Sequence, residues 1–258
     1  MAESDLVLSP SLWAAAAAVL LVAGVTQGAL GFGFPAISTP VLVVLTDVKT
    51  AIILNLLPNF TVNAISVAHG GNWSASIGRH WPVAAWVLVG SILGASFLIV
   101  APQEPIRVLL AIAIFAYLCQ QRLARFEWGW LARRPQLSAA VFGLTGGFFS
   151  GSVNNSLPPL LIYFTLLGLE TMAMTQMLNL CFLGGKLMQA ATLGLAGEIS
   201  LAAVIANVPL TLFALAGMWI GTRLQRWISA ETYHRLLRWV LLVIAVVLLG
   251  QGMRYFLR

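Results

Sequence analysis

The sequence has very little charge. Only 9% of its 258 residues are Asp, Glu, Lys or Arg, while 60% are hydrophobic. A soluble domain carries about 25% charged residues. A chain this poor in charge cannot cover a water-facing surface. Its long apolar runs predict an all-α integral membrane protein, because a helix satisfies its own backbone groups in lipid.

Residues that usually hold metals or carry out catalysis are scarce as well. The three histidines lie far apart, and no HExxH or paired-Cys spacing occurs. Cys119 and Cys181 lie in apolar runs, which indicates buried thiols rather than a disulfide. The chain also has no Walker motif. The sequence therefore predicts no metal site, no cofactor and no enzyme.

Ten apolar segments are predicted to be membrane helices, since about 20 apolar residues cross a bilayer. The second and seventh are short enough to be half-helices, in which case eight full spans are the alternative. The segments are residues 11–30, 35–46, 50–69, 81–101, 106–122, 137–153, 157–168, 172–194, 200–224 and 233–254.

The net charge of +6 does not indicate a nucleic-acid partner, because the basic residues are scattered among loops between apolar runs. If the N-terminus lies outside, nine of the 14 Lys and Arg residues fall on the cytoplasmic side and four fall outside, as the positive-inside rule expects. The first ten residues contain no Lys or Arg, so cleavage as a secretory signal is not expected. The nine are Arg79, Arg122, Arg125, Arg133, Arg134, Arg223, Arg226, Arg235 and Arg238.

Two stretches are apolar yet rich in residues that interrupt a helix. Residues 24–40 read GVTQGALGFGFPAISTP, and residues 143–159 read GLTGGFFSGSVNNSLPP. Broken apolar segments at corresponding positions of two halves indicate the substrate site of a transporter. The matching residues are Gly24, Thr26, Gly28 and Pro40 in the first stretch and Gly143, Thr145, Gly147 and Pro159 in the second.

Further matches in the same order indicate a duplication. Residues 54–56 recur as 178–180, and Pro82, Gly90 and Gly94 recur as Pro209, Gly217 and Gly221. With five spans in each half, the second half enters from the opposite side, which is an inverted-topology repeat. The predicted organisation is a tail (1–11), a first repeat (12–122), a cytoplasmic linker (123–136) and a second repeat (137–254).

Glycines spaced four residues apart form smooth strips on several predicted helices. Such strips let neighbouring helices approach closely. Packing inside the bundle is the expected use, and a homodimer interface is the alternative. The pairs are Gly24/Gly28, Gly90/Gly94, Gly143/Gly147 and Gly217/Gly221.

Lys186 lies near the middle of the predicted eighth span. A lysine at a helix centre costs about 2.5–3.5 kcal/mol on insertion scales, so something must offset its charge. No acidic residue lies deep in a predicted span, and Glu170 and Glu198 are more than three helical turns away. A bound anion is one answer. The alternative is a lysine that reaches the surface or donates to backbone carbonyls of the broken helices.

The breaks themselves are predicted to add to an anion site. A half-helix that starts inside a protein carries free N–H groups and a partial positive charge. Pro35 and Pro158 suit the first turns of such half-helices. Gly31 and Gly33, which lie in the first break, are further candidates for the site. The alternative is that Gly and Pro only kink packed helices.

Neutral polar side chains in or beside the breaks are candidate donors to an oxyanion that must leave again. Any one of them alone is more often a helix–helix hydrogen bond than a ligand contact. These candidates are Asn55, Asn59, Asn179, Asn154, Asn155, Gln27, Ser150 and Ser152.

Taken together, these residues resemble the TauE/SafE family of sulfite exporters. The resemblance rests on two apolar halves that each open with a Gly-rich break and a Pro, on the Asn179–Lys186 stretch, and on Gly197-Glu198 after it. It implies a secondary transporter of the bacterial inner membrane that moves small sulfur-containing anions. Asn154 and Asn155 stand where a second Gly-Phe-Gly would be expected, so the two halves of the site are not chemically equivalent.

The prediction is therefore an alternating-access exporter of a small anion, most simply sulfite, that works within the lipid bilayer. The alternatives are export of an organic sulfonate or carboxylate such as sulfoacetate, and a passive anion channel.

Overall fold

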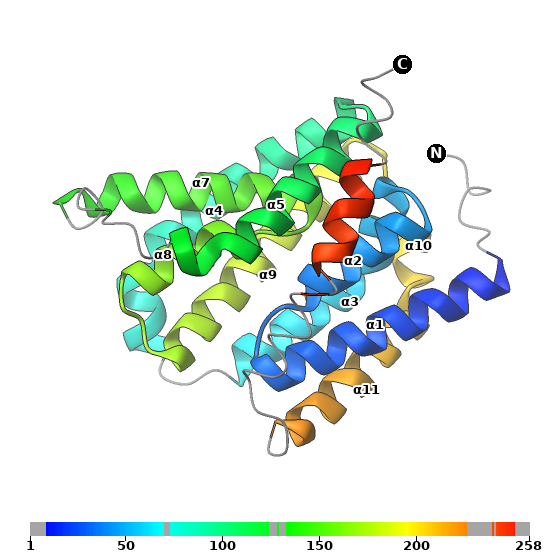
Figure 1. The fold of residues 1–258 in the computed structure, drawn as a ribbon, viewed down its shortest axis with the longest axis horizontal. Coiled ribbons are helices and arrows are strands. Elements are labelled where there is room, and N and C mark those ends of the chain that lie inside the picture. The colour runs from blue at the N-terminus through cyan, green and yellow to red at the C-terminus, as the bar shows by residue number, and fades with distance from the viewer. Residues whose placement is uncertain are drawn as a thin grey trace.

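The computed structural model describes residues 9–69, 73–123, 128, 133–225, 239 and 241–250, and within these ranges it contains helices and no strand (Figure 1). Most of the predicted linker, the tail before residue 9 and the ends of the tenth predicted span lie outside the described residues. The helices are α1 (Pro10–Leu30), α2 (Phe34–Leu45), α3 (Val48–Ala68), α4 (Trp73–Val100), α5 (Gln103–Leu123), α7 (Pro135–Val153), α8 (Leu157–Leu166), α9 (Thr171–Leu195), α10 (Leu201–Ile205) and α11 (Val208–Leu224), followed by Leu241–Gly250.

Helix starts follow local sequence signals. Ser9 accepts the Leu12 N–H at 3.3 Å and Pro10 occupies the first turn of α1, where a missing N–H costs nothing. Asp47 caps α3 by accepting the Thr50 N–H at 3.1 Å. The first eight predicted segments agree with the observed helices to within a few residues, except at the start of the fourth. The ninth differs, and the ends of the tenth lie outside the described residues.

Five described helical segments are long and apolar enough to cross a membrane: Pro10–Leu30, Val48–Ala68, His80–Val100, Gln103–Gln120 and Leu201–Leu224, the last of which comprises α10 and α11. α2 and α8 have only 12 and 10 residues, so they are about 18 and 15 Å long, well short of a hydrocarbon core of about 30 Å. α9 has 25 residues but carries buried polar side chains along one side, which explains why it falls outside the apolar set.

The predicted ninth span is not one continuous helix. It is divided into α10 and α11 at Ala206 and Asn207. Pro209 has no N–H to bond back into the preceding turn, which explains the interruption. The Asn207 amide donates to the Ile53 and Ala203 carbonyls at 2.9 and 3.1 Å and holds the bend against α3.

The spaced glycines bring two helix pairs into backbone contact inside the chain. A Cβ at Gly24 or Gly28 of α1 would overlap the Ala214 or Met218 carbonyl of α11. A Cβ at Gly147 of α7 would likewise overlap the Val87 carbonyl of α4. Figure 1 shows α1 beside α11 and α4 beside α7.

Most glycines of the two broken stretches do not interrupt a helix. Gly24 and Gly28 lie inside α1, and Gly143 and Gly147 lie inside α7. The chain leaves the helix only at residues 31–33 and 154–156. Helical glycines are tolerated here because they serve the close approach of a neighbouring helix.

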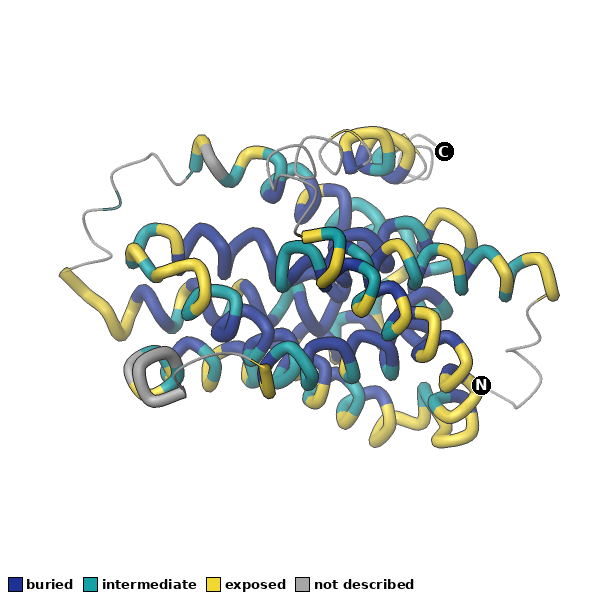
Figure 2. Tube along the Cα trace, turned by 90° about the horizontal axis from the view of Figure 1, so that it is seen from below, coloured by how far each residue is buried: buried dark blue, intermediate teal, exposed yellow. Residues whose placement is uncertain are grey.

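The outer surface of the bundle is apolar and part of its interior is polar, which suits a lipid environment. Buried residues run through the middle of the bundle and exposed ones lie along its outer edges (Figure 2). Large apolar side chains such as Leu93, Leu212 and Val246 are 57%, 62% and 59% exposed. Many Asn, Gln, Ser and Thr side chains, such as those of Gln27, Ser38 and Asn55, are instead buried in the interior.

Candidate functional site

The first break, residues 31–33 between α1 and α2, is closed by the side chain of Gln27. Gly31 and Gly33 have φ values of 80° and 108°, which favour glycine. Gln27 Oε1 accepts the Phe34 N–H at 3.1 Å, so the start of α2 is capped from within the chain. Gln27 Nε2 donates to Asn179 Oδ1 of α9 at 2.7 Å.

Asn179 completes this first group from the second half of the chain. Its Nδ2 donates to the Gly31 carbonyl at 2.7 Å and to the Thr175 carbonyl at 2.8 Å. Ser66 of α3 adds its hydroxyl oxygen, which accepts from Gln27 Nε2 at 2.9 Å. Three helices from both halves therefore meet at the first break.

The second break, residues 154–156 between α7 and α8, is built around Asn154. Asn154 has φ 60° and is the one described non-glycine residue with a positive φ. Its N–H and that of Asn155 bond back to the Ser150 and Phe149 carbonyls at 3.1 Å each, which terminates α7. The Asn154 amide donates to Thr39 Oγ1 of α2 at 2.8 Å.

A row of amide side chains on α3 leads to Asn154 and to Thr39. Asn63 Nδ2 donates to the Asn59 backbone carbonyl at 2.8 Å and also to Asn59 Oδ1. Asn59 Nδ2 then lies 3.5 Å from Asn154 Oδ1, and Asn55 Nδ2 lies 3.2 Å from Thr39 Oγ1. The backbone carbonyl fixes the orientation of the Asn63 amide, since its oxygen cannot face another oxygen.

Lys186 is attached to this second break through Gln189. The lysine is 2% exposed, and its ammonium donates to Gln189 Oε1. Gln189 Nε2 in turn donates to the Gly151 and Ser150 carbonyls at 2.7 and 3.3 Å, in the last turn of α7. The positive charge therefore lies close to the negative end of the α7 dipole, which stabilises it.

The half-helix N-termini offer few free donors. The Phe34 N–H is bonded to Gln27, and the Ala36 N–H to the Gly33 carbonyl at 3.1 Å. Pro158 and Pro159 lie in the first turn of α8 and have no N–H at all. Charge for an anion must therefore come mainly from Lys186.

The remaining predicted residues have local partners or none. Ser152 donates to the Phe148 carbonyl at 2.6 Å, one turn back in its own helix. The Ser150 side chain packs against Gly185, where a Cβ would overlap its hydroxyl. Asn155 is 2% exposed, and its Oδ1 has no hydrogen-bond partner among the described residues.

The structure thus divides the predicted residues into two groups. Gln27, Gly31 and Asn179 meet at the first break, with Gly33 at the start of α2. The second break gathers Lys186, Ser150, Ser152, Asn154 and Asn155 and is joined by Asn59 and Asn55.

Three residues outside the predicted set hold these groups together: Thr39, Ser66 and Gln189. Nothing separates Thr39 and Ser66 from other hydroxyls that bond within their own helix, so the sequence does not single them out. The spacing of Gln189 one turn beyond Lys186 does give a signal.

A model of the sulfite exporter TauE/SafE family matches residues 16–248. The chain belongs to this family. It is therefore a multi-pass membrane protein of a family of anion exporters. Neither a search of curated proteins nor a search of solved structures found a match.

For a TauE/SafE protein, access to the two breaks matters as much as their chemistry. A cavity of about 610 Å³ opens among the starts of α4, α7 and α9 and the end of α8. His80, Gln136, Tyr163 and Glu170 supply its polar lining. Gln136 is the last residue of the predicted cytoplasmic linker.

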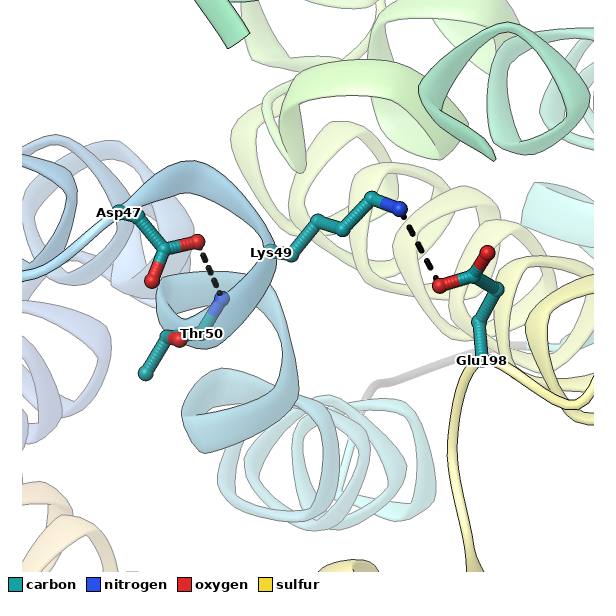
Figure 3. Close-up of polar contacts among 4 residues, drawn as sticks. All are labelled: Asp47, Lys49, Thr50 and Glu198. Atoms are coloured by element: carbon teal, nitrogen blue, oxygen red, sulfur yellow. Dashed lines mark hydrogen bonds and ion pairs between the residues drawn. The ribbon is translucent and has the colours of Figure 1, made fainter. Parts of the chain in front are cut away.

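The other end of α9 carries an ion pair. Lys49 at the start of α3 and Glu198 beyond the end of α9 point toward one another and form an ion pair (Figure 3). The cavity beneath them measures only about 10 Å³ and is walled by Ile52, Leu98 and Leu193, among others. This volume is about the smallest that can hold one water.

Proposed function

We propose that this TauE/SafE protein is a secondary transporter that exports a small sulfur oxyanion, most simply sulfite, across the bacterial inner membrane. The single observation that carries the proposal is Lys186. It is the one buried charged side chain among the described residues, and it lies against the second helix break. A buried lysine without a carboxylate partner is favourable when an anion binds beside it.

The substrate site is proposed to lie at the second break. Lys186 provides the charge, and Asn154, Asn155, Asn59 and Asn55 provide neutral polar contacts. Each is at most 2% exposed. The first break, with Gln27, Gly31, Gly33 and Asn179, is proposed to be its counterpart in the other repeat, occupied by amide side chains in place of a charge.

An inverted repeat is proposed to underlie the two breaks. The glycine contacts support this idea, because matching glycines of the two halves contact matching helices of the opposite half. Gly24 and Gly28 on the first helix of one half meet α11, the fourth segment of the other half. Their counterparts Gly143 and Gly147 meet α4, the fourth segment of the first half.

Alternating access is the proposed mechanism, with each half rocking against the other. The two ends of α9 differ in a way that supports it: a cavity of about 610 Å³ at one end and one of about 10 Å³ under the Lys49–Glu198 pair at the other. The positive-inside rule predicts that the larger cavity faces the cytoplasm. This arrangement corresponds to a state open toward the cytoplasm.

The test is sulfite efflux from proteoliposomes that contain the wild type, Lys186→Met or Lys186→Arg. We expect Lys186→Met to fold and insert, because it removes a costly buried charge, and to lose transport. Lys186→Arg keeps the charge and should retain part of it. Normal transport by Lys186→Met overturns the proposed role of Lys186.

Two further outcomes of the same assay would change the proposal. Transport of sulfoacetate but not sulfite keeps the site and changes the substrate. A flux faster than conformational steps on the μs–ms scale allow would indicate a channel.

A further inference from the structure

We propose that the anion recognised at the second break is a protonated monoanion, hydrogensulfite in its O–H form, and not the sulfite dianion. This inference rests on the proposed function and adds the protonation state of the substrate. Two independent features carry it: the number of charges at the break and the kind of polar atom left unpaired there.

The charge count favours one negative charge. Lys186 is the one charged side chain that is buried in the described part of the chain. The helices packed on α9 are α3, α4, α7 and α8. Besides Tyr163, their titratable residues are Lys49 in the first turn of α3 and Arg79 and His80 in the first third of α4. A dianion would therefore bring one uncompensated charge into a buried site, which is costly.

Backbone donors cannot make up for a second charge. The start of α2 is capped by Gln27, and the first turn of α8 contains Pro158 and Pro159. A helix N-terminus binds anions through its free N–H groups, and here the Phe34 and Ala36 N–H groups are paired while Pro158 and Pro159 have none. Lys186, with one of its three N–H groups donated to Gln189, is the main donor that a ligand can meet.

The buried side-chain atoms near the second break that lack a partner are amide oxygens, which accept hydrogen bonds. Asn63 Oδ1 and Asn155 Oδ1 are buried and have no partner among the described residues. Rotation of the Asn63 amide does not change this, because its nitrogen must face the Asn59 carbonyl at 2.8 Å. Asn155 is adjacent to Asn154, within about one helical turn of the carbonyls that hold Gln189 and hence Lys186.

An acceptor oxygen discriminates between the two forms of the substrate. Hydrogensulfite can accept from Lys186 and donate its O–H to an amide oxygen such as Asn155 Oδ1. The dianion has no hydrogen to donate, so the amide oxygen would remain unpaired and face a negative ligand, which is unfavourable. Each anion exported in this form also carries one proton out of the cell.

The experiment measures thermal shifts of the full chain in detergent, in a sodium-free choline buffer, across a pH series. The probes are sulfite, methanesulfonate, which is a monoanion without an O–H, and sulfate, which is a dianion. A ligand raises stability according to its concentration relative to its Kd. We expect the apparent Kd for total sulfite to rise tenfold per pH unit above the second ionisation of sulfurous acid.

Methanesulfonate serves as the internal control, because its charge does not change over this range. Any pH dependence of its binding reports groups of the protein and not of the ligand, and is subtracted. We expect methanesulfonate to bind at least tenfold more weakly than hydrogensulfite, and sulfate to give no shift. In Asn155→Ala, the ratio between hydrogensulfite and methanesulfonate should collapse toward one, whereas a structural role of Asn155 would weaken both anions equally.

Sulfite binding that is unchanged or stronger at high pH overturns the inference and leaves the proposed function intact. Equal binding of methanesulfonate and hydrogensulfite by the wild type does the same. A thermal shift that appears only when sodium replaces choline would mean that the unpaired amide oxygens bind a cation, and this outcome also overturns the inference. The absence of any shift with any sulfur oxyanion overturns the proposed function together with this inference.

Discussion

Lys49 Nζ lies 3.1 Å from Glu198 Oε2 and joins the first turn of α3 to the segment beyond α9 (Figure 3). The two residues are 149 positions apart and belong to different halves of the chain. Their side chains are 32% and 25% exposed, so solvent screens the pair. The ion pair therefore connects the two halves but contributes little to stability.

Exchange of the two charges should test this ion pair. We expect Lys49→Glu and Glu198→Lys each to lower thermal stability slightly and the double variant to restore it. The coupling free energy should be about 0.2–1 kcal/mol and should shrink at high salt. Thermal unfolding at two ionic strengths provides the double-mutant cycle. A coupling of several kcal/mol that salt does not change would argue against a screened surface pair.

Gly147→Ala should destabilise the α4–α7 contact. A methyl group there would overlap the Val87 carbonyl, so the helices must separate, at a cost of about 1–3 kcal/mol or more. Gly194→Ala is the matched control, because a Cβ at Gly194 meets nothing within 4 Å. The control should be neutral or stabilising by up to ~1 kcal/mol. Equal loss of stability in both variants, measured by thermal unfolding in detergent, would contradict the packing argument.

Gln27→Leu should open the first break. The substitution leaves the Phe34 N–H and Asn179 Oδ1 without their partner, and each buried unpaired group costs about 1–3 kcal/mol. Gln27→Glu should not rescue it, since its second oxygen would face Asn179 Oδ1. Gln225→Leu, at an exposed position, is the control for loss of an amide. Retention of wild-type stability by Gln27→Leu would show that the capping bonds are dispensable.

Comparison of Asn154→Gly with Asn154→Ala should separate backbone strain from side-chain bonding. Both variants lose the hydrogen bond to Thr39, but only alanine must hold φ near 60° with a Cβ. Alanine should therefore be less stable than glycine by about 1–2 kcal/mol. Both should transport sulfite more slowly than the wild type. If the two variants are equally stable, Asn154 carries no backbone strain.

The sequence predicts the helices well because membrane helices are set by length and apolarity, which are local properties. It also indicates a buried Lys186, since the lysine lies mid-span with no acidic residue nearby. It does not reveal which of many glycines break a helix. Gly28 and Gly31 look alike in sequence, yet the first packs on α11 and the second adopts a positive φ.

The partners of the site residues are harder to predict, because they depend on how helices pack. The sequence suggests that half-helix N-termini receive the anion, whereas Gln27 caps α2 and two prolines occupy the first turn of α8. Thr39 becomes important only because α2 brings it 2.8 Å from Asn154 Nδ2. No short-range pattern records that distance.

α9 holds both breaks at once. Asn179 bonds the Gly31 carbonyl of the first, and Gln189 bonds the Gly151 carbonyl at the edge of the second. These side chains are ten residues apart on one helix, or about 15 Å. α9 therefore fixes the distance between the two breaks. Any motion that changes this distance must break the hydrogen bond of Asn179 or that of Gln189. The two breaks therefore cannot both stay bonded to α9 during such a motion.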